Sequence, residues 1–184
     1  IGPDATATSA QSIALGKSAS ASGTDSIAIG NGSTAANKVA PVAIGQGAKA
    51  NGDFSVALGG GNHQFVGAIA NGVGSTALGT TSNTADGQNY QTVVGFGANT
   101  NKAESTAIGY KATVTVEGGV ALGANSSSST GRTVGYNPND GRTNTYSALT
   151  GNVIRSTTGA IAVGNGSTVT RQITGVAAGT NDTD

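Results

Sequence analysis

The five residues "SIALG" at positions 12–16 decide the fold, because the chain repeats this phrase with small variations. The later copies are "SIAIG" at 26–30, "PVAIG" at 41–45, "SVALG" at 55–59, "STALG" at 75–79, "QTVVG" at 91–95, "STAIG" at 105–109, "GVALG" at 119–123 and "AIAVG" at 160–164. Counted from Gly2, the closing glycines are mostly 14 or 15 residues apart, with longer intervals of 20, 16 and 41. A short period of this kind indicates a repeat architecture in which each unit stacks on the last.

Within each phrase, small and large residues alternate, which is the period of a β-strand. A glycine in every unit, with β-branched residues between, is unfavourable for a helix. A second alternating stretch starts three residues after each glycine, as Ala19 and Ala21 show, and the 20-residue unit has it at Ala68 and Ala70. Each unit is therefore predicted to form two short strands and two turns. The expected fold class is all-β, a parallel β-roll (a β-solenoid) with about 14 residues per coil.

A coil of 14 residues presses its two strands close together, so only small side chains fit between them. We therefore expect the small members of each phrase to lie inside the roll. This predicted interior consists of Ser12, Ala14, Ala28, Ala43, Ala57, Ala77, Ala107, Ala121 and Ala162. The alternative, with the large residues filling a wider core and the small ones facing water, is the weaker interpretation.

The large members of each phrase then point outward and form an apolar stripe along the rod. Monomeric soluble proteins seldom expose a large contiguous apolar patch, so the stripe is predicted to be an interface with identical chains. From the spacing alone, two, three or more chains are all compatible with a closed cyclic oligomer. The predicted interface residues are Ile13, Leu15, Ile27, Ile29, Val42, Ile44, Val56, Leu58, Leu78, Val94, Ile108, Val120, Leu122, Ile161 and Val163.

Composition excludes several classes of function. The nine basic and nine acidic residues balance, whereas a nucleic-acid surface needs a basic excess. The chain has no cysteine, which excludes disulfides and thiolate metal sites, and no apolar run long enough to span a membrane. The chain begins within the pattern, at "IGPDATA", so we expect it to be cut from a longer protein, and its targeting is not read directly from these residues.

Catalytic chemistry is not indicated. His63 is the single histidine, no cluster of potential metal ligands accompanies it, and no Ser, His and carboxylate arrangement suggests a triad. "GKS" at 16–18 lacks the upstream glycine of a phosphate loop, since position 11 is Gln11. We expect no catalytic residue, no metal and no cofactor. His63, Gln64 and Phe65 form a candidate ligand-contact loop in the 20-residue unit, with a purely decorative insertion as the alternative.

The regular spacing fails over residues 124–159, where "SSSST" and "NPNDG" indicate loops and turns. Tyr136 and Tyr146 flank "NPNDG" and are expected to fold a hairpin-like insertion over the roll. All four arginines follow residue 131, and arginine is favoured where a side chain makes fixed, bidentate contacts. Arg171 is therefore predicted to make such contacts, with a solvated loop charge as the alternative.

Units such as "SIAIGNGSTA", "SVALG" and "STAIGYKAT" resemble the head repeats of trimeric autotransporter adhesins, the YadA-like heads. The resemblance covers essentially the whole chain. It divides the chain into head repeats at 1–123, a head insertion at 124–159, a last head repeat at 160–169 and a neck motif at 170–184 that contains Arg171 and Gln172.

The resemblance implies a left-handed roll, a homotrimer and a location on the surface of a Gram-negative bacterium, anchored in the outer membrane by a separate domain. It implies adhesion to host extracellular-matrix proteins (collagen, fibronectin or laminin) or to other cells, and no nucleic-acid partner. In such heads, collagen binding has been linked to the repeated phrase. The matching residues are Ser26, Ile27, Ala28, Ile29, Gly30 and Ser33 in one unit and Ser55, Val56, Ala57, Leu58 and Gly59 in another.

Two other classes of function stay open as alternatives. A solenoid enzyme, such as an acyltransferase or a lyase, would need the histidine and carboxylate clusters that the chain lacks. An ice-binding or mineral-binding solenoid would need a regular array of outward threonines, whereas the threonines here vary between units.

Overall fold

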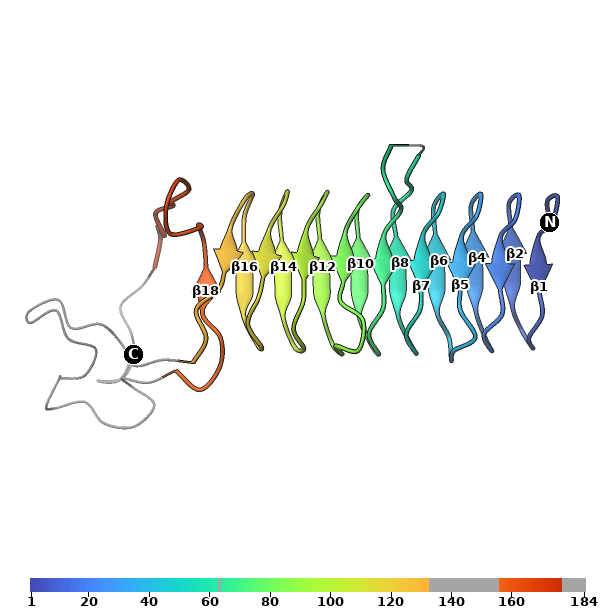
Figure 1. Cartoon of the computed structure of the whole chain (residues 1–184), viewed down its shortest axis with the longest axis horizontal. Helices are drawn as coiled ribbons and strands as arrows, with labels where there is room; N and C mark the ends of the chain where they lie inside the picture. The colour runs from blue at the N-terminus through green and yellow to red at the C-terminus, as the bar shows by residue number, and fades with distance from the viewer. Residues whose placement is uncertain (63, 133–155, 177–184) are drawn as a thin grey trace, which may run out of the picture.

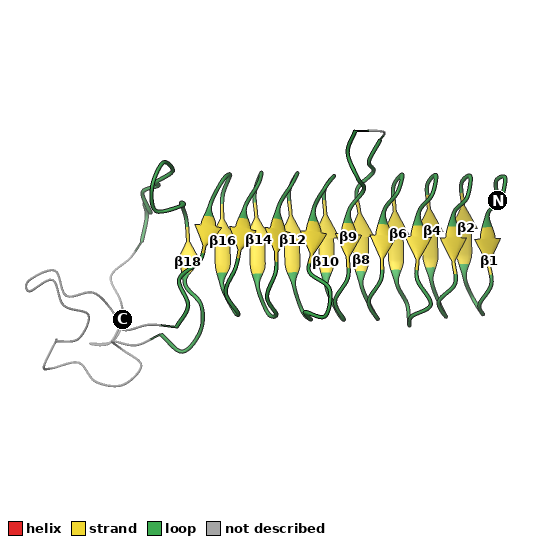
Figure 2. Ribbon diagram, in the orientation of Figure 1, coloured by secondary structure: helices red, strands yellow, loops and turns green. Residues whose placement is uncertain are grey.

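The computed structural model describes residues 1–62, 64–132 and 156–176, which form a straight rod of stacked coils (Figure 1). Within these residues the chain contains only strands, turns and loops, with no helix (Figure 2). Two sheets of nine parallel strands each run along the rod. The predicted all-β, parallel solenoid is thus confirmed, and the left-handed winding that the resemblance implies stays a prediction.

Sheet A is built from two-residue strands, one from the second half of each unit. They are β1 Thr6–Ala7, β3 Ser20–Ala21, β5 Thr34–Ala35, β7 Lys49–Ala50, β9 Ile69–Ala70, β11 Asn83–Thr84, β13 Asn99–Thr100, β15 Thr113–Val114 and β17 Ser127–Ser128.

Sheet B is built from the repeated phrase, which gives a strand of three residues in all but the last unit. The strands are β2 Ile13–Leu15, β4 Ile27–Ile29, β6 Val42–Ile44, β8 Val56–Leu58, β10 Thr76–Leu78, β12 Thr92–Val94, β14 Thr106–Ile108, β16 Val120–Leu122 and β18 Ile161–Ala162.

The sequence period equals one turn of the solenoid, because equivalent phrase positions pair with one another. Ile13 pairs with Ile27, and Ala14 pairs with Ala28. The same holds in sheet A, where Ala21 pairs with Ala35. Strands this short have little stability alone, so each coil depends on the hydrogen bonds and contacts of its two neighbours.

The 20-residue unit keeps the coil intact despite its insertion. Ala70 pairs with Ala50, as the small-residue pattern predicts. The backbone N–H of Ala68 donates to the carbonyl of Gly59 at 2.8 Å, which closes the turn across the inserted residues. The insertion therefore leaves the rod as a narrow protrusion, visible above β8 and β9 in Figure 2.

The interior of the roll is narrow and lined by small side chains. Alanines of both sheets are fully buried there, Ala28 and Ala35 among them, and Ser33 and Ser55 are buried at the turns. Larger side chains are buried in one stretch, where Val93 takes the place of the usual alanine and Gln91 and Val114 are buried as well. A dense interior of this kind leaves no space for Leu or Phe in the coils where alanines face each other across it.

Seven of the nine residues predicted for the interior are buried, namely Ala14, Ala28, Ala43, Ala57, Ala77, Ala107 and Ala121. Ser12 and Ala162 differ, since both are only partly buried. Both lie in the end phrases of the rod, where a neighbouring coil covers sheet B on one side only. The arrangement with the large phrase residues inside does not occur in the described coils.

We call the turn that follows each phrase the exit turn and the turn that precedes it the entry turn. The phrase glycine opens the exit turn and is needed for two reasons. Gly30 has a φ of +127°, which favours glycine, and a Cβ there would lie 2.6 Å from the carbonyl carbon of Gly45 in the next coil. The glycines stack directly on one another, so the closing residue of the phrase is fixed by backbone contact.

The phrase serine stabilises the entry turn. The hydroxyl of Ser55 donates to the carbonyl of Gly52 at 2.7 Å, and that of Ser105 donates to the carbonyl of Lys102 at 2.6 Å. In the unit that begins with Gln91, the side-chain amide donates instead to the carbonyl of Lys102 in the next coil. In these units the first position of the phrase thus satisfies a turn carbonyl inside the roll, whereas the buried Ser26 hydroxyl has no partner.

The regular coil continues into the segment predicted as an insertion, because β17 pairs with β15. The roll then resumes at β18, which pairs with β16 through Ala121 and Ala162. Between these two strands, the N–H of Ala160 donates to the carbonyl of Thr130 at 3.0 Å. The predicted hairpin with Tyr136, Tyr146 and "NPNDG" lies outside the described residues, and the division into insertion, last repeat and neck stays a prediction.

Candidate assembly and adhesion surfaces

The outer face of sheet B is a mostly apolar wall that runs the length of the rod. Each phrase strand contributes one side chain next to the entry turn and one next to the exit turn. Ile13 is 52% exposed and Leu58 is 40% exposed, which are high values for large apolar side chains. The remaining predicted interface residues all lie on this wall or at its C-terminal end, each partly buried or exposed (Ile27, Ile29, Val42, Ile44, Val56, Leu78, Val94, Ile108, Val120, Leu122, Ile161 and Val163; Leu15 lies beside Ile13).

The outer face of sheet A is mostly polar. Its strands turn outward Thr6, Ser20, Thr34, Lys49, Ile69, Asn83, Asn99, Thr113 and Ser127. Short polar side chains on a sheet are well solvated, so this face needs no protein partner to be stable in water. The two faces of the rod therefore differ in kind, and only the sheet B wall requires a cover.

Three neighbouring strands interrupt the apolar wall. Thr76, Thr92 and Thr106 occupy the position next to the entry turn and pair in register with one another. They form a short polar strip on the entry side of the wall, while Leu78, Val94 and Ile108 keep its exit side apolar.

The phrase residues that the family resemblance links to collagen binding do not form a common surface. Ser26, Ser33 and Ser55 are fully buried, as are Ala28 and Ala57. Of the matched side chains, Ile27, Ile29, Val56 and Leu58 reach the outside, all on the sheet B wall. A ligand on a single roll could therefore touch only the apolar half of the phrase.

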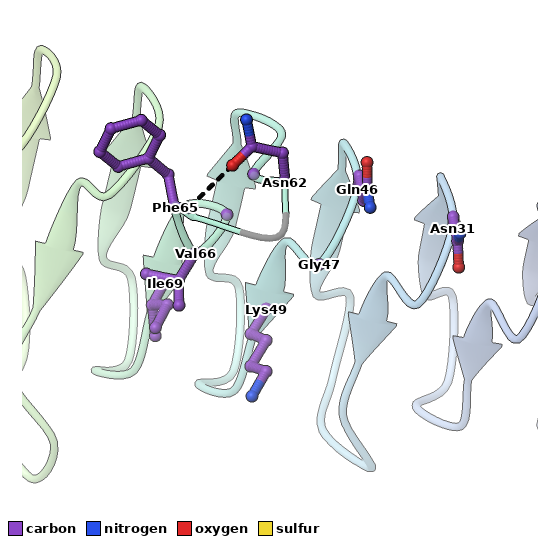
Figure 3. Close-up of a pocket in the computed structure, with 10 residues that line it drawn as sticks. Asn31, Gln46, Gly47, Lys49, Asn62, Phe65, Val66 and Ile69 are labelled. Atoms are coloured by element: carbon purple, nitrogen blue, oxygen red, sulfur yellow. Dashed lines mark hydrogen bonds between the residues drawn. The ribbon is translucent and has the colours of Figure 1, made fainter.

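The inserted loop forms a hollow of about 280 Å³ with the two preceding exit turns. Lys49 and Ile69 from sheet A lie at its base, and Val66 and Asn62 belong to the loop (Figure 3). The side-chain oxygen of Asn62 accepts the backbone N–H groups of Gln64 and Phe65, each at 2.8 Å. The loop is thus held by its own hydrogen bonds.

Phe65 points away from Lys49 and toward the following coils, as Figure 3 shows. Its ring contacts that of Phe96 edge to face at 5.3 Å, and Phe96 stacks with Tyr110 at 5.9 Å. The Lys111 Nζ lies 5.2 Å from the centre of the Tyr110 ring. Within the predicted ligand-contact loop, Gln64 and Phe65 are exposed, and His63 lies outside the described residues. We call Phe65, Phe96 and Tyr110 the aromatic ladder. The sequence did not predict it, because Phe96 and Tyr110 belong to units other than that of Phe65.

Arg171 makes three hydrogen bonds at the C-terminal end of the roll. Its guanidinium donates to the Ser126 hydroxyl at 3.0 Å, to the Ala124 carbonyl at 2.6 Å and to the Val163 carbonyl. It lies against the bare backbone of Gly123. Such contacts match the fixed geometry predicted for this arginine. Its neighbour Gln172 is exposed.

No group of three or more potential metal ligands lies together in the part of the chain that the structure describes. Those same residues contain no helix long and apolar enough to cross a membrane. These residues form a rod with one apolar face, one polar face, a row of entry turns on one long side and a row of exit turns on the other. These features define a structural and binding module built by repetition.

A family model described as the YadA head domain repeat matches the chain at residues 1–19, 7–33, 21–38, 42–62, 66–89, 92–112 and 101–126. The matches cover more than half of the chain, which belongs to the YadA head family. They place it among the YadA-like head domains of trimeric autotransporter adhesins, a non-enzymatic family. No curated protein sequence is significantly similar to the chain.

Proposed function

We propose that the chain is the adhesive head of a surface protein and works as a homotrimer whose three sheet B walls face a common axis. The observation that carries this proposal is the apolar wall of sheet B, whose exit side stays aliphatic where threonines line the entry side. Each large aliphatic side chain on it gains roughly 1.5–3 kcal/mol when fully removed from water. Identical parallel rods offer one another a wall of the same length and the same spacing.

Trimerisation through sheet B leaves the polar face of sheet A and the turns for ligands. Three copies of each weak contact then act together, so the head binds by avidity along its length. The proposed ligands are host extracellular-matrix proteins such as collagen, fibronectin or laminin, or the surface of another cell. The proposed location is the outer surface of a Gram-negative bacterium, with a separate domain as the outer-membrane anchor.

In this assembly, Ile27 and Val56 act on ligand binding indirectly. Both side chains are covered by neighbouring chains, and Ser26 and Ser55 are buried within the roll. The repeated phrase would therefore support adhesion by forming the trimer, and other residues would contact the ligand. The inserted loop and the outer face of sheet A are the proposed contact regions.

Sedimentation equilibrium tests the assembly. We expect a solution mass of three times the chain mass of 17.6 kDa, independent of salt because the wall is apolar. A mass of 17.6 kDa at micromolar concentration would contradict the proposal.

A binding screen tests the adhesion. The chain is applied to surfaces coated with collagen, fibronectin or laminin and to intact mammalian cells. A variant with Ile44 replaced by aspartate, which is expected to be monomeric, serves as the avidity control. We expect retention of the native protein on at least one surface and loss of retention for the variant. Equal retention of both would contradict an avidity mechanism.

A further inference from the structure

The two long sides of sheet B, where its strands begin and end, are unlike, because all nine strands run in the same direction from entry turn to exit turn. We call the row of exit turns the exit edge of the chain and the row of entry turns its entry edge. In Figure 1 the exit turns line one long side of the rod, together with the inserted loop, and the entry turns line the other. Chains related by rotation about an axis parallel to the rod keep the same polarity. Each junction between neighbours must then join the exit edge of one chain to the entry edge of the next.

Along both edges, backbone hydrogen bonds join each turn to the turn of the next coil. Each turn side chain therefore has a fixed position along the rod axis, which we call its height. We call the exposed turn residues just before and just after a phrase its entry tip and its exit tip. On the exit edge, Lys111 N–H donates to the Phe96 carbonyl at 2.9 Å. On the entry edge, Glu104 N–H donates to the Asn89 carbonyl at 3.0 Å. Successive tips are therefore one strand spacing apart, about 4.8 Å. Rotation without translation brings the two tips of the same phrase together at each corner.

The two tips of one phrase carry side chains that attract each other. The phrase at 105–109 has Glu104 at its entry tip and Lys111 at its exit tip. Both are exposed, and neither has an oppositely charged partner in the described part of the chain. The preceding phrase, at 91–95, has Tyr90, which is 62% exposed, at its entry tip and Phe96, which is 37% exposed, in its exit turn. Phe96 follows its phrase glycine by one residue, where Lys111 follows its own by two, and its ring also packs with Phe65 and Tyr110 of the same chain.

The next phrase, at 119–123, continues the match. Its entry tip carries Glu117, and the guanidinium of Arg171 is bonded to its exit turn. Over the whole rod, the entry edge carries more carboxylates than cations (Asp25, Asp53, Asp86, Glu104 and Glu117 against Lys38, Lys102 and Arg132), and the exit edge carries more cations (Lys17, Lys111 and Arg171 against Asp4).

We propose that the partner of each edge is the opposite edge of a second copy of this chain, with Glu104 facing Lys111 and Tyr90 facing Phe96 across every corner. This inference rests on the proposed homotrimer. An exposed ion pair adds little to stability. Its effect here is to fix the height of one chain against the next, since a uniform apolar wall alone would allow neighbours to slide by whole coils.

Cysteine cross-linking tests the pairing in a chain that has no cysteine of its own. The double variant Glu104→Cys with Lys111→Cys places one thiol on each edge. Within one chain these thiols are separated by at least the length of the five-residue phrase, about 17 Å at about 3.3 Å per strand residue. That separation is far beyond the reach of a disulfide, so any bond must join two chains.

After mild oxidation we expect the double variant to run as a covalent trimer on a non-reducing denaturing gel. Each single variant should run as a monomer. The matched control, Glu104→Cys with Gln46→Cys, places the exit-edge thiol four phrases away and should also run as a monomer. The native mass is measured before denaturation.

The outcomes separate the two proposals. A native trimer in which Glu104→Cys with Lys111→Cys stays uncross-linked would overturn the edge pairing and leave the homotrimer standing. Equal cross-linking of the control would overturn it as well, because contact would then be random. A native monomer would overturn both.

Charge exchange gives an independent measurement without thiols. We expect Lys111→Glu alone and Glu104→Lys alone to slow reassembly after dilution from denaturant, and the double exchange to recover the native rate. A double exchange that performs no better than the two single changes combined would overturn the pairing.

Discussion

Sheet A and sheet B enclose the same narrow interior, yet their outer faces have opposite chemistry. Inside, Ala35 of sheet A and Ala28 of sheet B are equally buried. Outside, Thr34 of sheet A is followed along the rod by Lys49, whereas Ile29 of sheet B is followed by Ile44. The interior alternation makes a coil, and the outer residues decide what the coil contacts.

The comparison teaches how one short phrase encodes two levels of structure. The small residues of the phrase set the thickness of the roll, and the large ones set the surface that it buries in assembly. Residues of the second strand close the roll and leave a solvated face. Four substitutions separate these contributions.

Placing a charge on the sheet B wall should have the largest effect. Ile44→Asp would put one carboxylate from each chain into the proposed interface, at a cost on the order of 3–5 kcal/mol per chain. We expect loss of the trimer by sedimentation equilibrium. The matched control is Thr34→Asp on sheet A, whose register partner is Lys49. A control that dissociates as readily as Ile44→Asp would mean that the two faces do not differ in function.

Filling the interior tests what the two sheets share. Ala43 is fully buried between them, and Ala43→Leu forces three additional carbon atoms into a dense space. We expect a loss of about 3 kcal/mol or somewhat more, seen as a lower midpoint in thermal unfolding by circular dichroism. Ala43→Ser is the control, because serine lines the same interior in other positions. If the leucine variant unfolds like wild type, the roll is wider than its buried alanines indicate.

The exit turn offers a matched pair of glycines two residues apart. Gly30→Ala places a Cβ 2.6 Å from the backbone of Gly45 and requires a φ of +127°, so we expect a loss of about 2–3 kcal/mol. Gly32 has a φ of +65° with open space around it, and Asn125 occupies the equivalent position in another unit. Gly32→Asn should therefore change the free energy of unfolding by less than about 0.5 kcal/mol. Chemical denaturation measures both variants, and equal losses would refute the role of glycine stacking.

Arg171→Lys should have the smallest effect of the four. Lysine keeps the charge but cannot reach the Ser126 hydroxyl, the Ala124 carbonyl and the Val163 carbonyl together, so about 1 kcal/mol is lost. We expect faster amide hydrogen exchange in the C-terminal coils of the variant than in those of the native protein. Gln172→Ala, which alters an exposed neighbour, is the control. An unchanged exchange rate in Arg171→Lys would show that these contacts are not stabilising.

Most of the fold could be predicted because the period is visible in the sequence. Ala14, Ala28 and Ala43 recur with the glycines, and alternation assigns them to the same side as one another. Even the insertion before Ala68 was recoverable, since the small-residue pair resumes after it. The partial exposure of Ser12 and Ala162 was not, because the pattern does not tell an inner coil from an end coil.

The candidate surfaces were only partly predictable. The apolar wall follows from the same alternation as the interior. The ladder of Phe65, Phe96 and Tyr110 does not, because it joins an inserted loop to exit turns of later units. The partners of Arg171 likewise come from two different coils, at Ala124 and Val163, and no spacing rule relates them.

The sequence by itself determined the β-roll, its period and the side of each strand that faces inward, because these depend on local alternation repeated at a fixed interval. Only the tertiary structure decided which turns lie along each edge and which side chains meet there. It stacked Lys111 on Phe96 and Glu104 on Asn89, which belong to the turns of the preceding phrase, and so fixed their heights on the rod. The physical reason is that stacking, and not chain order, brings residues of different coils together.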